Sequence, residues 1–292
     1  MPVITPAIST QFVQSVKLPK APARPRRART LGDTPPVELK ATDAQTLVVG
    51  SGLIIAAENV PAQTREDLVN CTLFAQLAAS GTVGDSAKVP EWYDVYFRTL
   101  TALGWAQSDT HFEEYAFDSK NAEAHQAISK VLAVLLGPQA AALVVVKTAI
   151  EALQSMNENS PWIALFDRQS RTGRSARFQV ATAQIDGGGL LQTALVGFDL
   201  KATSTLTQVL FFKFSSSATS LKYAAGRATI YEAALAGQRD AIAQRLAAYR
   251  AAYVGQVAFP PPPARGARSL RASRVPRARS TKRTSVARLL LE

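Results

Sequence analysis

Between two polar ends, the chain alternates between helix-like and strand-like spacing of its apolar residues. Residues 46–57 are apolar and β-branched, which predicts a strand pair or a single bent strand. Apolar residues then recur three and four positions apart over 64–79 and 91–103, which predicts two helices. A short aromatic stretch at 111–117 is typical of an edge strand. The first part of the chain therefore predicts two helices flanked by short strands.

Two strongly apolar helices are predicted next, at 121–136 and 138–153. Gly137 suits the C-terminal end of the first helix and Pro138 the first turn of the second, so the two should form a helical hairpin. Such a hairpin can pack on a sheet or, once released, lie in a bilayer interface. Its apolar stripes are our candidates for contact with lipid. They contain Ile128, Leu132, Leu135, Leu143, Val146 and Ile150.

From residue 161 the spacing changes to that of strands. The predicted strands are 161–167, 176–185, 190–201, 207–214 and 220–230. Turn-forming residues separate them, and short turns between consecutive strands favour antiparallel pairing. Residues 231–254 return to helical spacing. Helices followed by strands predict the α+β class, here an antiparallel sheet sandwiched between α-helical hairpins.

The formal net charge of +11 is concentrated at the two ends of the chain. Residues 1–40 carry +5, residues 259–292 carry +8, and the body between them carries −2. Both ends are also rich in proline, which is typical of extended, solvated segments. We therefore expect a basic, disordered N-terminal segment (1–40), one α+β domain (41–258) and a disordered Pro/Arg-rich tail (259–292).

The sequence offers little material for catalysis or metal binding. It has one cysteine, Cys71, and two histidines, His111 and His125, so a disulfide framework and a cysteine-cluster metal site are excluded. Residues 84–87 read Gly-Asp-Ser-Ala, which resembles a serine-protease signature but needs a partner histidine at triad geometry. We expect no enzymatic activity, no metal and no cofactor. Cys71 lies on an apolar helix face, where we expect a small buried hydrophobe; whether it is modified stays open.

Four arginines surround one predicted hairpin loop: Arg168, Arg171, Arg174 and Arg177. Basic side chains near an anionic membrane surface contribute roughly 1 kcal/mol each to binding. These arginines are our second set of candidates for contact with lipid. The alternative interpretation is an ordinary solvated loop.

The strand-rich region resembles the Cyt family of cytolytic delta-endotoxins and the related Evf-like virulence factors. The motifs that carry the resemblance are Val-Gly-Phe-Asp-Leu-Lys at 196–201 and Gln-Val-Leu-Phe-Phe at 208–212. It extends over about 121–230. The resemblance implies a sheet between helical hairpins and a secreted protein that acts on target membranes without an enzymatic step, after proteolytic trimming at both ends. The chain departs from the family in its arginine-rich tail, its basic 168–177 loop, and Thr193-Ala194 where relatives can carry cysteine.

These observations predict a secreted, toxin-like virulence protein that interacts with membrane lipids, which could include anionic ones. We expect it to act by pore formation or membrane disruption. Self-association of the protein on the membrane is a further possibility. A lipid-binding factor that does not lyse membranes is the alternative, as is nucleic-acid binding through the arginine-rich tails, which would be strongly salt-dependent. No secretory signal precedes the body, so we expect an extracellular protein released from a bacterial cell without one, with the target-cell membrane as its destination.

Overall fold

The computed structural model describes residues 6–22, 39, 43–84, 88–108, 111–116, 123–155, 161–202, 205–206, 208–210 and 219–256. They belong to one compact unit, Met1–Phe259. Its helices are α1 (Pro6–Ser15), α2 (Ala62–Val83), α3 (Val89–Ala102), α4 (Ala124–Leu136), α5 (Ala141–Ser155), α6 (Pro161–Ser170), α7 (Glu232–Ala236), α8 (Arg239–Leu246) and α9 (Arg250–Tyr253). Its strands are β1 (Gln45–Val49), β2 (Gly52–Ala56), β3 (Trp105–Gln107), β4 (Glu113–Glu114), β5 (Arg171–Thr172), β6 (Ser175–Ile185), β7 (Leu191–Lys201), β8 (Ser220–Ile230) and β9 (Val254–Gln256).

One sheet runs through the unit, with the order β3-β8-β7-β6-β2-β1-β9 among the described strands. Strand β4 extends it beside β8, and β5 beside β6. The pairings are antiparallel except that of β2 with β6, which is parallel. Helices α2 to α6 lie between β2 and β6 in the sequence, and a connection of that length allows parallel pairing.

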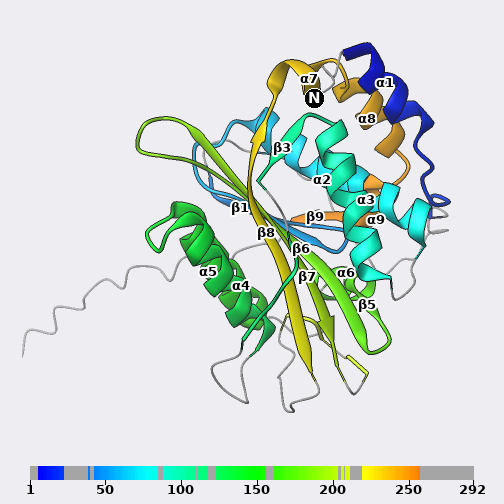
Figure 1. Cartoon of the computed structure of the whole chain (residues 1–292). Coiled ribbons are helices and arrows are strands. Elements are labelled where there is room, and N and C mark those ends of the chain that lie inside the picture. Colours follow the sequence, from blue (N-terminus) through cyan, green and yellow to red (C-terminus); the bar gives the residue numbers. More distant parts are fainter. Residues whose placement is uncertain are drawn as a thin grey trace, which may run out of the picture. The chain divides into compact units, whose positions relative to one another are not determined.

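The sheet lies between two helical layers, with α4 and α5 on one face and α2 and α3 on the other (Figure 1). Alternate residues of β6 show the division. Phe178 and Val180 are buried in the core beneath α4 and α5, whereas Ala181 and Ala183 are buried in the core beneath α2 and α3. The predicted α+β class, with a mostly antiparallel sheet between helical hairpins, is confirmed.

Hydrogen bonds between buried side chains hold α2 and α3 to the sheet. Gln76 of α2 donates from Nε2 to the Val49 carbonyl at 2.9 Å, and its Oε1 accepts from the Ser51 backbone N–H at 3.1 Å. The Tyr93 hydroxyl of α3 lies 2.8 Å from the Phe178 carbonyl oxygen. The same hydroxyl accepts from Nε2 of Gln179 in β6 at 3.1 Å. We refer to Ser51, Gln76, Tyr93 and Gln179 as the polar network.

Most of the predicted elements are present. The apolar stretch 46–57 is the hairpin β1–β2, which turns at Gly50 with a φ of 55°. The strands predicted at 176–185, 190–201 and 220–230 agree with β6, β7 and β8 to within one residue at either end. The helical hairpin predicted over 121–153 is α4 and α5. Helix α4 begins later than predicted, behind a capping box in which Glu123 and Gln126 satisfy each other's backbone N–H groups.

The predicted strand at 161–167 is wrong, because these residues form the start of α6. Proline is favoured in the first turn of a helix, where its missing N–H has no intrahelical partner, and Pro161 stands there. Ile163 and Phe166 are three positions apart and both are buried, which is helical spacing. The short apolar stretch was compatible with either period.

The predicted strand at 207–214 is not found where it can be checked. Among the described residues 208–210, Val209 forms a bend and Leu210 a turn, and residues 207 and 211–214 lie outside the described residues. Val209 is nevertheless fully buried, and its N–H donates to Oδ1 of Asp167 at 3.0 Å. The Asp167 carboxylate of α6 therefore accepts a backbone hydrogen bond that a neighbouring strand would accept in a sheet.

The single helix predicted at 231–254 is also wrong. It is divided into α7, α8 and α9, and the chain then pairs as β9 with β1. Gly237 ends α7, while Leu235, Ile242 and Leu246 stay buried in one core. Pairing with β9 covers an edge of β1 that would otherwise expose its backbone hydrogen-bonding groups.

The N-terminal segment departs from the expectation of disorder over residues 6–22. Helix α1 packs on α8, and Val13 is fully buried. The Arg245 guanidinium of α8 donates to the carbonyls of Gln14 and Val16, and the Tyr249 hydroxyl donates to the Pro19 carbonyl at 2.6 Å. A side chain at Gly81 would collide with the carbonyl of Lys17, so the segment crosses α2 at close range. The Pro/Arg-rich tail 259–292 lies outside the described residues.

Candidate functional site

The apolar residues selected on the helical hairpin face the sheet. Ile128 and Leu132 of α4, and Leu143, Val146 and Ile150 of α5, are each buried to at least 96%. Leu135 is half-buried and packs against the same core. In this conformation the six candidates form the contact between the hairpin and the sheet, so a lipid could reach them only if the hairpin moved away.

A different set of apolar side chains is exposed on the same layer. Val134 of α4 is 88% exposed and Val144 of α5 is 61% exposed. Leu190, in the turn between β6 and β7, is 69% exposed, and Leu191, the first residue of β7, is 37% exposed. The N–H of Ala142, at the start of α5, donates to Oε1 of Gln184 near the end of β6. The α4–α5 connection and the β6–β7 turn therefore lie at the same end of the unit. We call Val134, Val144, Leu190 and Leu191 the apolar end.

Sequence reasoning missed the apolar end. Leu190 and Leu191 directly follow the glycine-rich turn, so they read as the start of a strand. Val134 and Val144 lie outside the apolar stripes of two helices that have apolar residues on several faces. The available signal was the position of two leucines beside a turn, where side chains are commonly exposed.

Asp186 holds the β6–β7 turn in its conformation. Its Oδ1 accepts from the N–H groups of Leu190 and Gly188, each at 2.9 Å, and its Oδ2 accepts from Gln192 at 3.1 Å. The bond from Leu190 contributes most to lowering the pKa of this carboxyl below its ordinary value. The turn therefore stays fixed while Asp186 is ionised, and it presents Leu190 in a defined position. The glycine run forms a hairpin turn, as expected.

The structure separates the four arginines predicted to share one loop. Arg168 is exposed in the last turn of α6, and Arg171 and Arg174 are exposed at the β5–β6 turn. Arg171 donates from Nη1 to the Leu206 carbonyl at 2.7 Å. Arg177 is 7% exposed on β6, and its guanidinium carbon lies 4.6 Å from the ring centroid of Trp92 in a cation–π contact. The three exposed arginines form a basic cluster, which Arg177 does not join.

The basic cluster and the apolar end lie at opposite ends of β6. The cluster adjoins Ser175 and the β6–β7 turn follows Ile185, so the eleven residues of β6 separate them. At 3.3 Å a residue that is about 35 Å. Helices α4 and α5 extend along the sheet (Figure 1), and α6, which carries Arg168, packs on the same core.

Cys71 is buried in α2, as expected for a small hydrophobe. Burial raises the pKa of its thiol to about 12, so the thiol stays protonated and unreactive near neutral pH. Within the described ranges, no three histidine, cysteine, aspartate or glutamate side chains are grouped as metal ligands. Residues 85–87 of the protease-like motif lie outside the described residues.

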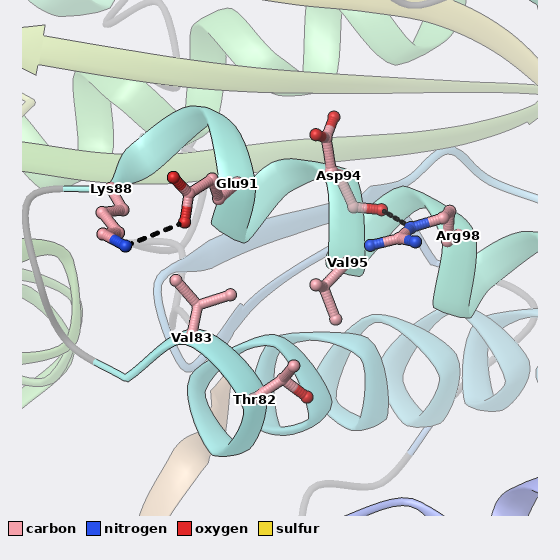
Figure 2. Close-up of a pocket in the computed structure, with 7 residues that line it drawn as sticks. All are labelled: Thr82, Val83, Lys88, Glu91, Asp94, Val95 and Arg98. Atoms are coloured by element: carbon pink, nitrogen blue, oxygen red, sulfur yellow. Dashed lines mark hydrogen bonds and ion pairs between the residues drawn. The ribbon is translucent and has the colours of Figure 1, made fainter.

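A hollow between the end of α2 and the start of α3 is lined by charged side chains (Figure 2). Nζ of Lys88 lies 3.5 Å from Oε2 of Glu91, and Nε of Arg98 donates to the Asp94 carbonyl at 3.1 Å. These contacts join neighbouring turns of α3, which is ordinary behaviour of charged residues on a helix surface. The hollow has mixed charge and selects no ligand class.

No helix within the described ranges combines the length and the apolarity that crossing a bilayer demands.

No protein-family model matches the chain, and no curated protein matches it. Among solved structures, one titled "DELTA-ENDOTOXIN" is similar over 63% of this chain and 84% of that chain, with 12% identity and a TM-score of 0.41. "Structure of the Evf virulence factor" is similar over 70% of this chain and 85% of that chain, with 9% identity and a TM-score of 0.32. These neighbours are a toxin and a virulence factor. Similarities of this size carry no functional argument, so the proposal below rests on the residues.

Proposed function

We propose that this protein adsorbs to anionic membranes through the α4–α5 layer and the apolar end, in keeping with the toxin-like character expected from the sequence. The observation that carries the proposal is the exposure of four aliphatic side chains, Val134 and Val144 on α4 and α5 and Leu190 and Leu191 at the end of the β6–β7 turn and the start of β7. The Ala142–Gln184 hydrogen bond holds the start of α5 near the end of β6 that leads into this turn. Exposed aliphatic side chains gain free energy when a bilayer interface covers them.

Electrostatic attraction would add to this apolar contact. Lys147 is exposed on α5, three residues from Val144, and Arg168 of the basic cluster is exposed on α6, which packs on the same core as α4 and α5. Cations beside an anionic surface contribute roughly 1 kcal/mol each, and this contribution decreases as salt screens it. Apolar contact and charge attraction together favour an anionic bilayer over a neutral one.

The second step of the proposal is a movement of the α4–α5 hairpin. Its buried face and the sheet beneath it are apolar, with Ile128, Leu132 and Val146 in one cluster with Phe178 and Val196. Apolar contact is not directional, so acyl chains can replace the sheet as the partner of this hairpin. The six buried candidates would then meet lipid. The action is physical and needs no catalytic step.

The test compares vesicle binding and dye release for two matched pairs of substitutions. Leu190→Ser with Leu191→Ser removes half of the apolar end, and Val134→Ser with Val144→Ser removes the other half. Tyr231→Ser is the control for the loss of a large exposed side chain, because Tyr231 is 62% exposed beside α7 and belongs neither to α4 and α5 nor to the β6–β7 turn.

We expect each pair to weaken binding to phosphatidylserine vesicles at least tenfold, while the control binds as the unaltered protein does. Equal binding by all variants would contradict the proposal. Dye release that follows binding supports movement of the hairpin and membrane disruption. Binding without release contradicts the second step and leaves a lipid-binding protein that does not lyse membranes.

A further inference from the structure

A cavity of about 530 Å³ lies between α4 and the edge of the sheet formed by β8 and β4. Its size is within the range of ligand-binding cavities in proteins. Ala225 of β8 lies between Tyr223 and Arg227 on the face that α4 covers, and its small side chain leaves this space open. Val131 and Leu135 of α4 form an apolar wall beside it.

One end of the cavity is aromatic and held in place. The Tyr223 hydroxyl donates to Oε2 of Glu113 at 2.9 Å. Tyr115 packs its ring edge against Tyr223, with 6.2 Å between the ring centroids and 72° between the planes. Aromatic rings attract a further ring in the same edge-to-face or offset arrangements.

The other end of the cavity is cationic. Arg227 is two residues beyond Ala225 on β8, and its Nε donates to the Leu135 carbonyl at 3.2 Å. This bond fixes the position of the guanidinium and uses neither of its terminal nitrogens. Lys130 also lines the cavity, and the Glu113 carboxylate accepts from Tyr223 at the aromatic end.

We infer that this cavity binds a small aromatic carboxylate, with its ring against Tyr115 and Tyr223 and its carboxylate at Arg227. The two ends suit one molecule, because Arg227 lies four positions beyond Tyr223 on β8, which is about 14 Å along the strand. Paired hydrogen bonds from a guanidinium favour a carboxylate over other polar groups. This inference goes beyond the proposed membrane binding, since it concerns one dissolved molecule in a site between α4 and β8.

The test uses three probes that separate charge from shape: 4-phenylbutyrate, 4-phenylbutylammonium and butyrate. The first two share the ring and the length but differ in charge, and the third has the carboxylate without the ring. Binding to the full-length protein is measured by isothermal titration without membranes, so the result is independent of the membrane proposal.

Two substitutions and one control complete the test. Arg227→Met removes the cation and keeps the length of the side chain, and Ala225→Phe fills the cavity. Arg98→Met is the control, since Arg98 is an exposed arginine of α3 that also bonds to a backbone carbonyl. Melting temperatures establish that each variant is folded.

For the unaltered protein we expect 4-phenylbutyrate to bind at least tenfold more tightly than either other probe. Arg227→Met should abolish the preference for the anion, Ala225→Phe should abolish binding, and Arg98→Met should change neither. Failure of 4-phenylbutyrate to bind, equal binding of the cationic probe, equal binding of butyrate, or unchanged binding to a folded Ala225→Phe variant would each overturn the inference.

Discussion

The two helical layers are attached to the same sheet by different kinds of contact. On one face, the polar network links Gln76 of α2 and Tyr93 of α3 to β6 and to the turn between β1 and β2. On the other face, Ile128, Leu132 and Val146 pack on Phe178 and Val196 through apolar surface. The hydrogen bonds of Ala142 to Gln184 and of Arg227 to the Leu135 carbonyl lie near the α4–α5 connection. A phenylalanine pair shows how apolar that face is, since the rings of Phe178 and Phe198 are stacked 4.7 Å apart beneath the hairpin.

This difference indicates which layer can respond to a membrane. Buried hydrogen bonds are directional, and breaking them in an apolar medium leaves polar groups without partners. Apolar contacts lose little when one apolar partner replaces another. In the proposed membrane binding, a bilayer would therefore substitute for the sheet beneath α4 and α5 and would not substitute for the polar network beneath α2 and α3.

The largest effect is expected from removing the N-terminal segment that packs on the α2–α3 side. Deleting residues 1–22 uncovers the site of the fully buried Val13 and removes partly buried Phe12 and Leu18 from the same core. We expect a loss of about 4 kcal/mol of unfolding free energy. This corresponds to a melting temperature roughly 10 °C lower.

Deletion of residues 259–292 is the matched control, and we expect it to change the melting temperature by no more than a few degrees. If the two deletions lowered the melting temperature equally, the claim that the packing of α1 stabilises the protein would be contradicted. The trimming expected from the family resemblance, if it removed all of residues 1–40, would therefore also remove part of the core.

The second comparison uses two glutamines of the same strand. Gln179 bonds to Tyr93 and to Ser51 on the α2–α3 face, while Gln184 bonds to the N–H of Ala142 on the α4–α5 face. We expect Gln179→Leu to lower the free energy of unfolding by about 3 kcal/mol and Gln184→Leu by about 1 kcal/mol. Urea unfolding measures both changes. A larger loss of stability for Gln184→Leu than for Gln179→Leu would refute the claim that the α2–α3 layer is the more strongly attached.

Most of the sheet and both helical hairpins were predictable from the sequence, because their apolar residues repeat at clear periods over ten or more residues. The stretch at 161–167 was too short to distinguish the periods, and its helix depends on Pro161 and on the burial of Ile163 and Phe166. Helix α1 was missed because its stability comes from Arg245 and Tyr249, more than 200 residues away in the chain.

The sequence predicted the helices of the candidate site, but not which of their side chains are exposed. The helical spacing identified the hairpin, but burial reversed the roles of its residues: the periodic stripe packs on the sheet, and Val134 and Val144 are exposed. The spacing of the arginines by three suggested one cluster. Alternation along β6 instead turns Arg177 toward Trp92, which only the register of the strand determines.

The third prediction separates the basic cluster from its buried neighbour. Replacing exposed Arg168 and Arg174 with glutamine removes two cations worth roughly 1 kcal/mol each near an anionic surface, so binding to phosphatidylserine vesicles at low salt should weaken about 30-fold. The melting temperature should stay unchanged. Arg177→Gln should do the reverse, lowering the melting temperature with little effect on the binding of the folded protein. Vesicle co-sedimentation and thermal melting check both predictions. If the double variant binds vesicles as well as the unaltered protein does, the basic cluster does not contribute to membrane binding.

The smallest effect concerns Asp167, on the α4–α5 face. Burial raises the pKa of its carboxyl above the ordinary value, against the bond from Val209 and the charge of Arg171. The folded state therefore holds this proton more tightly than the unfolded state, so the contribution to stability is present at low pH and is lost as pH rises through the raised pKa.

Asp167→Asn keeps an acceptor for the Val209 N–H and removes this titration. The melting temperature of the variant relative to that of the unaltered protein should increase slightly between pH 3 and pH 7, because only the unaltered protein loses stability as this carboxyl ionises. A constant difference across this range would show that the carboxyl does not titrate differently on folding.

The central claim is that the α4–α5 layer, and not the α2–α3 layer, responds to a membrane. Amide hydrogen exchange, with and without phosphatidylserine vesicles, measures this directly for every helix. We predict that exchange changes in α4, α5 and the β6–β7 turn, while the amides of α2 and α3 keep the exchange rates they have in solution. Exchange that changes in α2 and α3 and stays constant in α4 and α5 would contradict the account.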